Sequence, residues 1–339
     1  MFTATTEGYY EFRTTATDSA NNKETKPITS EREVGYDSTT PSSSVNTTSY
    51  WVNTNITITV GAYDDISDIK NVTLWYRYSS DNVTWWEECI PFGVDENHPW
   101  EWVFNVPNGV GYYEFYSTAN DNALNYKDYT ITPEEVCAYD NITPPAPTSL
   151  LPSNDTWINT STPTFNWSNV IDDTSGLANY TIQVDNNMDF SSPEYTATVA
   201  ANSTISSVLT DGIYYWRVRA VDNASNAGDW SEIWIIKIDI FLPVAAIQTP
   251  AESSCFNSVP IWFNGTCSNG LSGINRVEIN ITYKESNTVV VPWTSTNLAI
   301  NYTWWDYPFY PSAEASYTIR IRSVDNASNA QEILPIINI

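Results

Sequence analysis

One segment recurs four times along the chain, and this internal repeat constrains the fold more than any other feature. Each copy starts with a tyrosine, alternates apolar and polar residues, and ends in an aspartate that continues as Asp-x-Ala-x-Asn. The aspartates are separated by 103, 101 and 103 residues. A constant spacing of this kind indicates one structural unit repeated in tandem. The copies are Tyr10–Asp18, Tyr113–Asp121, Tyr214–Asp222 and Tyr317–Asp325.

The alternation within each copy predicts a half-buried β-strand followed by a hairpin. In the third copy Tyr214, Trp216, Val218 and Ala220 fall on one face, and polar side chains fall on the other. The run Asp-x-Ala-x-Asn that follows contains residues suited to a tight turn. We therefore predict that each copy forms the last two strands of one β-sandwich.

Two further recurring elements set the domain limits. An aspartate followed four residues later by proline occurs at Asp37, Asp140 and Asp239, and we interpret these stretches as domain joints that proline stiffens into a rod. Turns around Asp65–Ile69, Asp173–Leu177 and Leu271–Ile274 are expected to lead into the third strand of each domain. The predicted domains are 37–139, 140–238 and 239–339, with residues 1–36 as the final hairpin of a fourth domain.

A lone hairpin cannot form a core. Either the chain was cut from a longer repeat protein, which we favour, or a neighbouring subunit supplies the missing strands by strand addition.

The composition predicts an all-β fold. Aromatic residues make up 14% of the chain, charged residues only 16%, and Trp alone contributes 15 positions. Together with abundant Thr, Ser, Asn, Val and Ile, this mixture favours strands and turns over long helices.

The charge balance argues against nucleic acid as a partner. Acidic residues outnumber basic ones by 40 to 14, and no Lys/Arg-rich stripe is present to neutralise phosphates. High salt, bound divalent cations or solubility alone would each account for the acidic excess. The sequence has no apolar run of about 20 residues, so we predict no membrane span in this segment and expect any secretion signal to lie elsewhere.

The four cysteines fall in two pairs, one in each of two predicted domains. No Cys-x-x-Cys spacing occurs and His98 is the single histidine, so disulfides outrank a zinc site. We predict the pairs Cys89–Cys137 and Cys255–Cys267, which indicate an extracellular location.

Acceptor sites for N-glycans give independent support for an extracellular location. The pattern Asn-x-Ser/Thr occurs fifteen times, which predicts covalent N-glycans on the surface. The sites are Asn46, Asn55, Asn71, Asn82, Asn141, Asn154, Asn159, Asn166, Asn179, Asn202, Asn223, Asn264, Asn280, Asn301 and Asn326.

Residues in the second predicted domain resemble a known module. The segment Thr162–Ser168, the strand beginning at Tyr180 and the segment Asp211–Asp222 are similar to a prokaryotic fibronectin type III-like module. The other two domains resemble bacterial and archaeal immunoglobulin-like repeats. The resemblance implies tandem β-sandwiches of the kind used in surface layers, adhesin stalks, filaments and spacer regions of secreted enzymes.

Calcium is the sharpest ligand hypothesis, because carboxylates recur where an immunoglobulin-like sandwich brings two loops to the same end, and related repeats sometimes bind calcium there. The competing interpretation is that Asp-x-Ala-x-Asn is only a good hairpin turn. The candidate ligands are Asp64, Asp65 and Asp121 in one domain, Asp172, Asp173 and Asp222 in the next, and Asp325 in the last.

Clustered aromatics, among them Trp85–Trp86, Trp100 with Trp102, and Trp304–Trp305, either pack in cores or stack on sugars or neighbouring chains. Adjacent aromatics in a strand point to opposite faces, so at least one of Trp85 and Trp86 is expected to be exposed, or covered by a glycan or another subunit. Trp100 and Trp102 stand at alternate positions and are expected to share one face.

Enzyme chemistry finds little support. A single histidine excludes most base-assisted nucleophile triads, and no glycine-rich phosphate loop is present, which leaves only acidic pairs as candidate catalytic groups. We therefore predict no enzyme, and instead a glycosylated structural subunit of an extracellular filament, surface layer or adhesin stalk, assembling with copies of itself. The alternative is a spacer or carbohydrate-binding region of a larger secreted enzyme.

Overall fold

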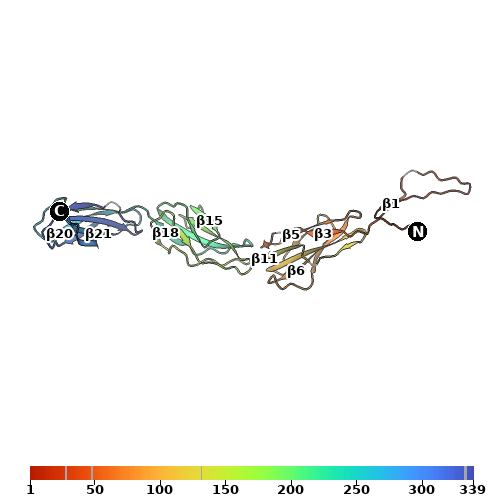
Figure 1. Ribbon diagram of the computed structural model, residues 1–339, viewed down its shortest axis with the longest axis horizontal. Helices are drawn as coiled ribbons and strands as arrows, with labels where there is room; N and C mark the ends of the chain where they lie inside the picture. The colour runs from red at the N-terminus through yellow and green to blue at the C-terminus, as the bar shows by residue number, and fades with distance from the viewer. Residues whose placement is uncertain (27–28, 47–48, 131, 332–333) are drawn as a thin grey trace. The chain divides into compact units, whose positions relative to one another are not determined.

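The structure, a computed structural model, describes residues 1–26, 29–46, 49–130, 132–331 and 334–339. These residues form β-strands joined by loops and contain no α-helix (Figure 1), which confirms the predicted all-β class. No helix in the described part of the chain is long and apolar enough to cross a membrane.

The described chain divides into two compact units. The first comprises Met1–Pro144, Ile171–Leu177 and Asp222–Ala227, and the second comprises Pro145–Val170, Ala178–Val221 and Gly228–Ile339. We use the names first, second and third sandwich for residues 37–139, 140–238 and 239–339, because no sheet crosses these limits.

The first unit starts with a two-stranded antiparallel hairpin and continues into the first sandwich. The hairpin pairs β1 (Gly8–Phe12) with β2 (Arg32–Tyr36), and none of the described residues among 1–36 is buried. One sheet of the sandwich has the order β4-β11-β9-β6-β7 with β10 on β9, and the other has the order β3-β5-β8. The strands are β3 (Ser42–Val45), β4 (Trp51–Val52), β5 (Ile56–Tyr63), β6 (Ile69–Ser79), β7 (Ile90–Asp95), β8 (Glu101–Phe104), β9 (Gly111–Asp121), β10 (Tyr126–Lys127) and β11 (Glu135–Tyr139).

The two sheets of the first sandwich enclose an aromatic core. Phe104, Tyr113 and Phe115 are fully buried there, and their rings meet edge to face at centroid distances of 5.2 and 4.9 Å. Trp102 lies in the same core and Trp100 packs partly against it, so these alternate tryptophans share one face as predicted.

The second sandwich, most of whose residues belong to the second unit, has one large and one small sheet. The large sheet has the order β12-β18-β17-β14-β15, and the small one pairs β13 with β16. The predicted alternation along β17 is confirmed, because Tyr214, Trp216, Val218 and Ala220 are all buried. The strands are β12 (Thr156–Ile158), β13 (Thr164–Asn166), β14 (Leu177–Asp185), β15 (Tyr195–Val199), β16 (Ser203–Ile205), β17 (Gly212–Asp222) and β18 (Trp234–Ile238).

The third sandwich has two four-stranded sheets. Their orders are β19-β20-β24-β23 and β22-β21-β25-β26, which is the arrangement of an immunoglobulin-like sandwich. The strands are β19 (Val244–Thr249), β20 (Ile261–Ser268), β21 (Ile274–Tyr283), β22 (Val289–Ser295), β23 (Asn297–Leu298), β24 (Trp304–Phe309), β25 (Tyr317–Asp325) and β26 (Ile336–Asn338).

The repeated Asp-x-Ala-x-Asn segment forms the same turn in all four copies, as the sequence predicts. In each copy the amide of the aspartate donates to the carbonyl of the asparagine four residues on. The fourth residue of the turn has a left-handed backbone every time, with φ of 67° at Asn21, 73° at Leu124, 70° at Ser225 and 72° at Ser328.

The two predicted disulfides are absent from the structure, in which Cys89, Cys137, Cys255 and Cys267 are all free. Cys137 is paired opposite Tyr113 and points into the core, whereas Cys89 lies near Arg77 and Glu114, whose salt bridge is on the other face of the same sheet. A Cys89–Cys137 bond would therefore have to pass through the sheet.

Cys255 and Cys267 are separated by the length of a strand. Cys255 lines a cavity of about 670 Å³ together with Ile261, the first residue of β20, whereas Cys267 lies near the opposite end of that strand. Six residues of strand span about 20 Å, far beyond the reach of a disulfide.

Candidate metal centres

Three loops are tied together in the same way in each sandwich. The first carries the joint aspartate, Asp37, Asp140 or Asp239, which we call the linker aspartate. The second is the turn before the third strand, where Asp64, Asp172 or Asn269 stands five residues before that strand begins; we call these the turn residues. The third is the hairpin, which begins with the hairpin aspartate, Asp121, Asp222 or Asp325, and ends with the hairpin asparagine, Asn125, Asn226 or Asn329.

The hairpin asparagine fixes the linker to the hairpin. Its side-chain Nδ2 donates to the carbonyl of the linker aspartate at 3.3 Å for Asn125, 2.9 Å for Asn226 and 2.8 Å for Asn329. The same side chain also donates to Oδ2 of the hairpin aspartate, at 2.8, 2.7 and 2.8 Å. The linker carbonyl and the hairpin carboxylate are therefore held beside each other in every copy.

A second asparagine fixes the hairpin to the turn. The residue after each hairpin aspartate donates from Nδ2 to a serine carbonyl in the turn, at 2.7 Å for Asn122, 2.8 Å for Asn223 and 2.6 Å for Asn326. The three loops thus form one hydrogen-bonded framework, and this framework is repeated three times.

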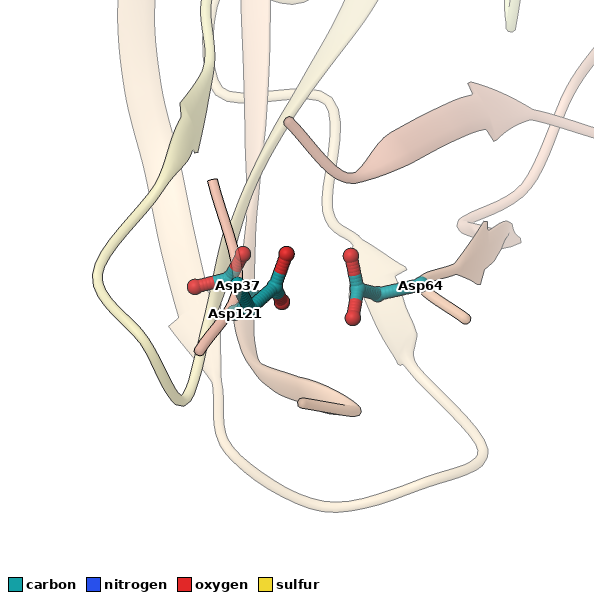
Figure 2. A group of neighbouring side chains, drawn as sticks. All are labelled: Asp37, Asp64 and Asp121. Atoms are coloured by element: carbon teal, nitrogen blue, oxygen red, sulfur yellow. The ribbon is translucent and has the colours of Figure 1, made fainter. Parts of the chain in front are cut away.

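In the first unit this framework brings together Asp37, Asp64 and Asp121. One carboxylate oxygen of each lies within 4.8 Å of the corresponding oxygens of the other two. Figure 2 shows the carboxylate of Asp64 facing those of Asp37 and Asp121. Asp121 is fully buried and Asp64 is 7% exposed.

Two oxygens in this first group have no hydrogen-bond partner. Oδ1 of Asp64 accepts from the amides of Ile66 and Ser67, but its Oδ2 is buried without a partner, and so is Oδ2 of Asp37. A buried carboxylate oxygen without a donor or a cation is costly. These two oxygens therefore make the group a candidate site for a positively charged ligand.

A second group of the same kind, Asp140, Asp172 and Asp222, also belongs to the first unit. Its ligand oxygens again lie within 4.8 Å of one another, and Asp140 and Asp222 are 0% and 1% exposed. Oδ1 of Asp172 accepts from the amides of Thr174, Ser175 and Gly176, which fixes the direction of that carboxylate.

Neither group is paired with a basic side chain among the residues that the structure describes. No salt bridge formed by the described residues involves any of the six carboxylates. Two unit charges at this separation repel each other by about 3 kcal/mol at an effective dielectric constant of about 20. A divalent cation would convert this repulsion into attraction.

The spacing suits calcium. Two oxygens on opposite sides of one calcium ion are about 5 Å apart, because Ca–O distances are about 2.3–2.6 Å. Calcium is coordinated by backbone carbonyls and water as well as by carboxylates. Three aspartates would therefore provide part of its usual shell of six to eight oxygens.

Of the candidate ligands predicted from the sequence, four lie in a three-carboxylate group and three do not. Asp64 with Asp121, and Asp172 with Asp222, are brought together as expected. Asp65 and Asp173 are exposed and lie outside both groups. Asp325 is buried, but its group contains an asparagine instead of a third carboxylate.

Sequence reasoning missed Asp37 and Asp140, which it treated only as joint markers. The signal was present, because the linker aspartates repeat with nearly the same spacing as the hairpin aspartates.

The glycan acceptor sites differ in exposure. Asn46, Asn82, Asn154 and Asn301 are exposed, whereas Asn280 on β21 is buried and its Nδ2 donates to the carbonyl of Val291. That nitrogen is the atom that would carry a glycan, so the folded third sandwich does not present Asn280 for modification.

No family model matches this sequence, and no curated protein is similar to it. Solved structures with a likeness include the FN1–FN3 domains of chicken CNTN1, at 13% identity, TM-score 0.33, and coverage of 87% of this chain and 96% of that one. The fibronectin(III)-like modules of Clostridium thermocellum CbhA match at 13% identity and TM-score 0.36, covering 56% and 86%.

A tetra-tandem repeat from the extending region of a large adhesion protein is similar at 15% identity and TM-score 0.31, covering 96% of this chain and 79% of that one.

Proposed function

We propose that this chain is an extracellular structural array of β-sandwiches in which calcium fixes the linker to the sandwich that the linker enters. The observation that supports the proposal is the position of Asp37 and Asp140. Each is a linker residue whose carbonyl is bonded to the hairpin and whose carboxylate joins the three-carboxylate group.

Calcium binding would restrict the linker by a simple mechanism. Without the ion, the linker carboxylate is repelled by the two others, and release of the linker relieves that repulsion. With the ion, all three carboxylates share one ligand, so release of the linker costs a coordination bond. A ligand at 100 times its dissociation constant stabilises the folded state by about 2.7 kcal/mol per site.

The same proposal covers the biological setting. An array with restricted linkers suits a glycosylated subunit of a filament, surface layer or adhesin stalk that assembles with copies of itself. Its support is the tandem repeat of sandwiches and the fifteen glycan acceptor patterns, several of them exposed.

A second candidate function is a spacer or carbohydrate-binding region of a larger secreted enzyme. The observation that favours it is a pair of exposed tryptophans on neighbouring strands, Trp262 on β20 at 51% and Trp304 on β24 at 45%. Exposed indole rings offer flat apolar faces on which sugar rings stack.

Calcium titration of the full chain, with thermal unfolding, tests the proposal. The chelated protein should take up two calcium ions and gain melting temperature on doing so. Asp64→Asn should lose one ion, whereas Asp65→Asn, which changes the adjacent exposed carboxylate, should keep both. No bound calcium and an unchanged melting temperature in chelator would overturn the calcium proposal.

Electron microscopy of the native material tests the biological setting. A filament or surface array should appear as a repeating assembly of this chain with density at the glycan sites. Isolated chains that bind immobilised polysaccharide through Trp262 and Trp304 would instead support the second candidate function.

A further inference from the structure

The third sandwich contains the same three-loop framework, with one exchange at its centre. Asp239 and Asp325 are the linker and hairpin aspartates there, 0% and 1% exposed, and Asn329 bonds both of them. The turn residue is Asn269, five residues before β21 begins, whereas Asp64 and Asp172 stand five residues before β6 and β14.

The side-chain amide of Asn269 points into the group of carboxylates. Its Nδ2 lies 3.2 Å from Oδ2 of Asp239, 3.1 Å from Oδ2 of Asp325 and 3.0 Å from Oγ of Ser272. The amide nitrogen thus contacts one oxygen of each carboxylate, and an NH2 group has two protons to donate to them.

The chemistry of the group fixes the orientation of this amide. If the amide were reversed, its Oδ1 would lie about as close to two carboxylate oxygens, with no proton between them. In the observed orientation Oδ1 is buried without a partner, a smaller cost than one oxygen facing two negative charges.

We propose that Asn269 makes the third sandwich independent of calcium, because its NH2 group performs the bridging that the ion performs in the first two groups. The inference rests on the proposed calcium sites and adds a rule for them. A carboxylate at the turn position creates a cation site, and an amide at that position replaces the cation.

The rule follows from charge. The Asn269 group contains two carboxylates and a donor, whereas the Asp64 and Asp172 groups each contain three carboxylates. Removing one negative charge removes two of the three repulsions in the group and lowers its attraction for a divalent cation. The donor then bonds the two carboxylates that remain.

The first experiment counts calcium ions on the full chain by calorimetric titration after removal of metal. The wild-type chain should bind two ions and Asn269→Asp three, whereas Asn269→Ala, which removes the amide without adding a charge, should stay at two. In chelator, Asn269→Asp should melt below the wild-type protein, and calcium should restore the difference.

The outcomes separate this inference from the function on which it rests. A wild-type chain that binds no calcium overturns the calcium sites themselves. A wild-type chain that binds two ions while folded Asn269→Asp also binds two overturns only the inference. Three ions on the wild-type chain would mean that the third group also binds calcium, with Asn269 as a ligand. That result would overturn the inference as well.

A reciprocal pair of variants tests the rule if Asn269→Asp does not fold. Asp64→Asn installs the amide in the first group, and Asp64→Ala removes the carboxylate without supplying a donor. Both should lose one calcium ion, but in chelator Asp64→Asn should melt above Asp64→Ala. Equal melting temperatures in chelator would show that the amide bridges nothing, which overturns the inference.

Discussion

The side-chain amide of Asn329 donates a hydrogen bond of 2.8 Å to the main-chain carbonyl of Asp239, a residue 90 positions earlier in the chain. Both residues are buried, and the same nitrogen also donates to the carboxylate of Asp325. The start of the third sandwich is thereby fixed to its last hairpin without any disulfide or ion.

Asn329→Ala should therefore destabilise the third sandwich in the presence and in the absence of calcium. Loss of a buried donor that serves two acceptors costs about 1–3 kcal/mol. Chemical denaturation monitored by tryptophan fluorescence measures this loss. Asn275→Ala is the matched control, because Asn275 also bonds through its amide, to Asn326, but at an exposed position. Equal effects of the two variants would contradict the prediction.

Leu124→Asn should stabilise the first sandwich. Leu124 has φ of 73° and is 69% exposed. Its left-handed backbone is therefore unfavourable for a residue with a Cβ atom, and no core contacts of the side chain compensate for that cost. Asparagine tolerates this conformation and occupies the same turn position at Asn21, so we expect a gain of about 1 kcal/mol. Leu124→Ala keeps the Cβ atom and should show no such gain, and the comparison is made by thermal unfolding.

Asp81 should titrate far below an ordinary aspartate. Hydrogen bonds from the amides of Thr84 and Val83 and from the Ser79 hydroxyl lower the pKa of Asp81 from 3.8 to about 2. Because the folded-state pKa is depressed, this carboxylate stabilises the fold above its ordinary pKa, and the stabilisation is lost as pH falls from 3.8 toward 2. Carbon-detected NMR titration gives the value directly. Asp81→Asn should remove this part of the acid dependence, and a measured pKa near 3.8 would refute the assignment.

The four thiols should react in order of their burial. Cys255 is exposed and should react with iodoacetamide in the folded protein at pH 8. Cys137 should react only after unfolding, because burial raises the pKa of its thiol to about 12 and excludes the reagent. Mass spectrometry of the labelled peptides checks both statements. If non-reduced samples instead contained peptides crosslinked through Cys89 and Cys137, that result would contradict the free thiols of the structure and show that the disulfide forms.

The strands and hairpins were predictable because their signals are local. The alternation that ends at Asp222 sets the inward face of β17, and the residues after Asp222 determine the turn. The pairing of Asp64 with Asp121 was also predictable, since the loops that carry them lie at the same end of an immunoglobulin-like sandwich.

What the sequence did not reveal depends on which way single side chains point. Asp64 and Asp65 are equivalent in the sequence, yet only Asp64 turns inward, because the amides of Ile66 and Ser67 bond its carboxylate. Cys89 and Cys137 share a domain but lie on opposite faces of one sheet. The role of Asn269 required atomic positions, since the sequence alone does not show which atom of an amide faces the carboxylates.

The burial of Asn280 would require any glycan at this site to be attached before the third sandwich folds. In the folded third sandwich its amide nitrogen is bonded to Val291 across the β21–β22 ladder, so no transferase reaches it after folding is complete. A glycan attached earlier would occupy the place of that bond and keep β22 from closing on β21. On a chain that is N-glycosylated, folding and modification at Asn280 would therefore compete, and the faster process would decide whether β22 closes on β21.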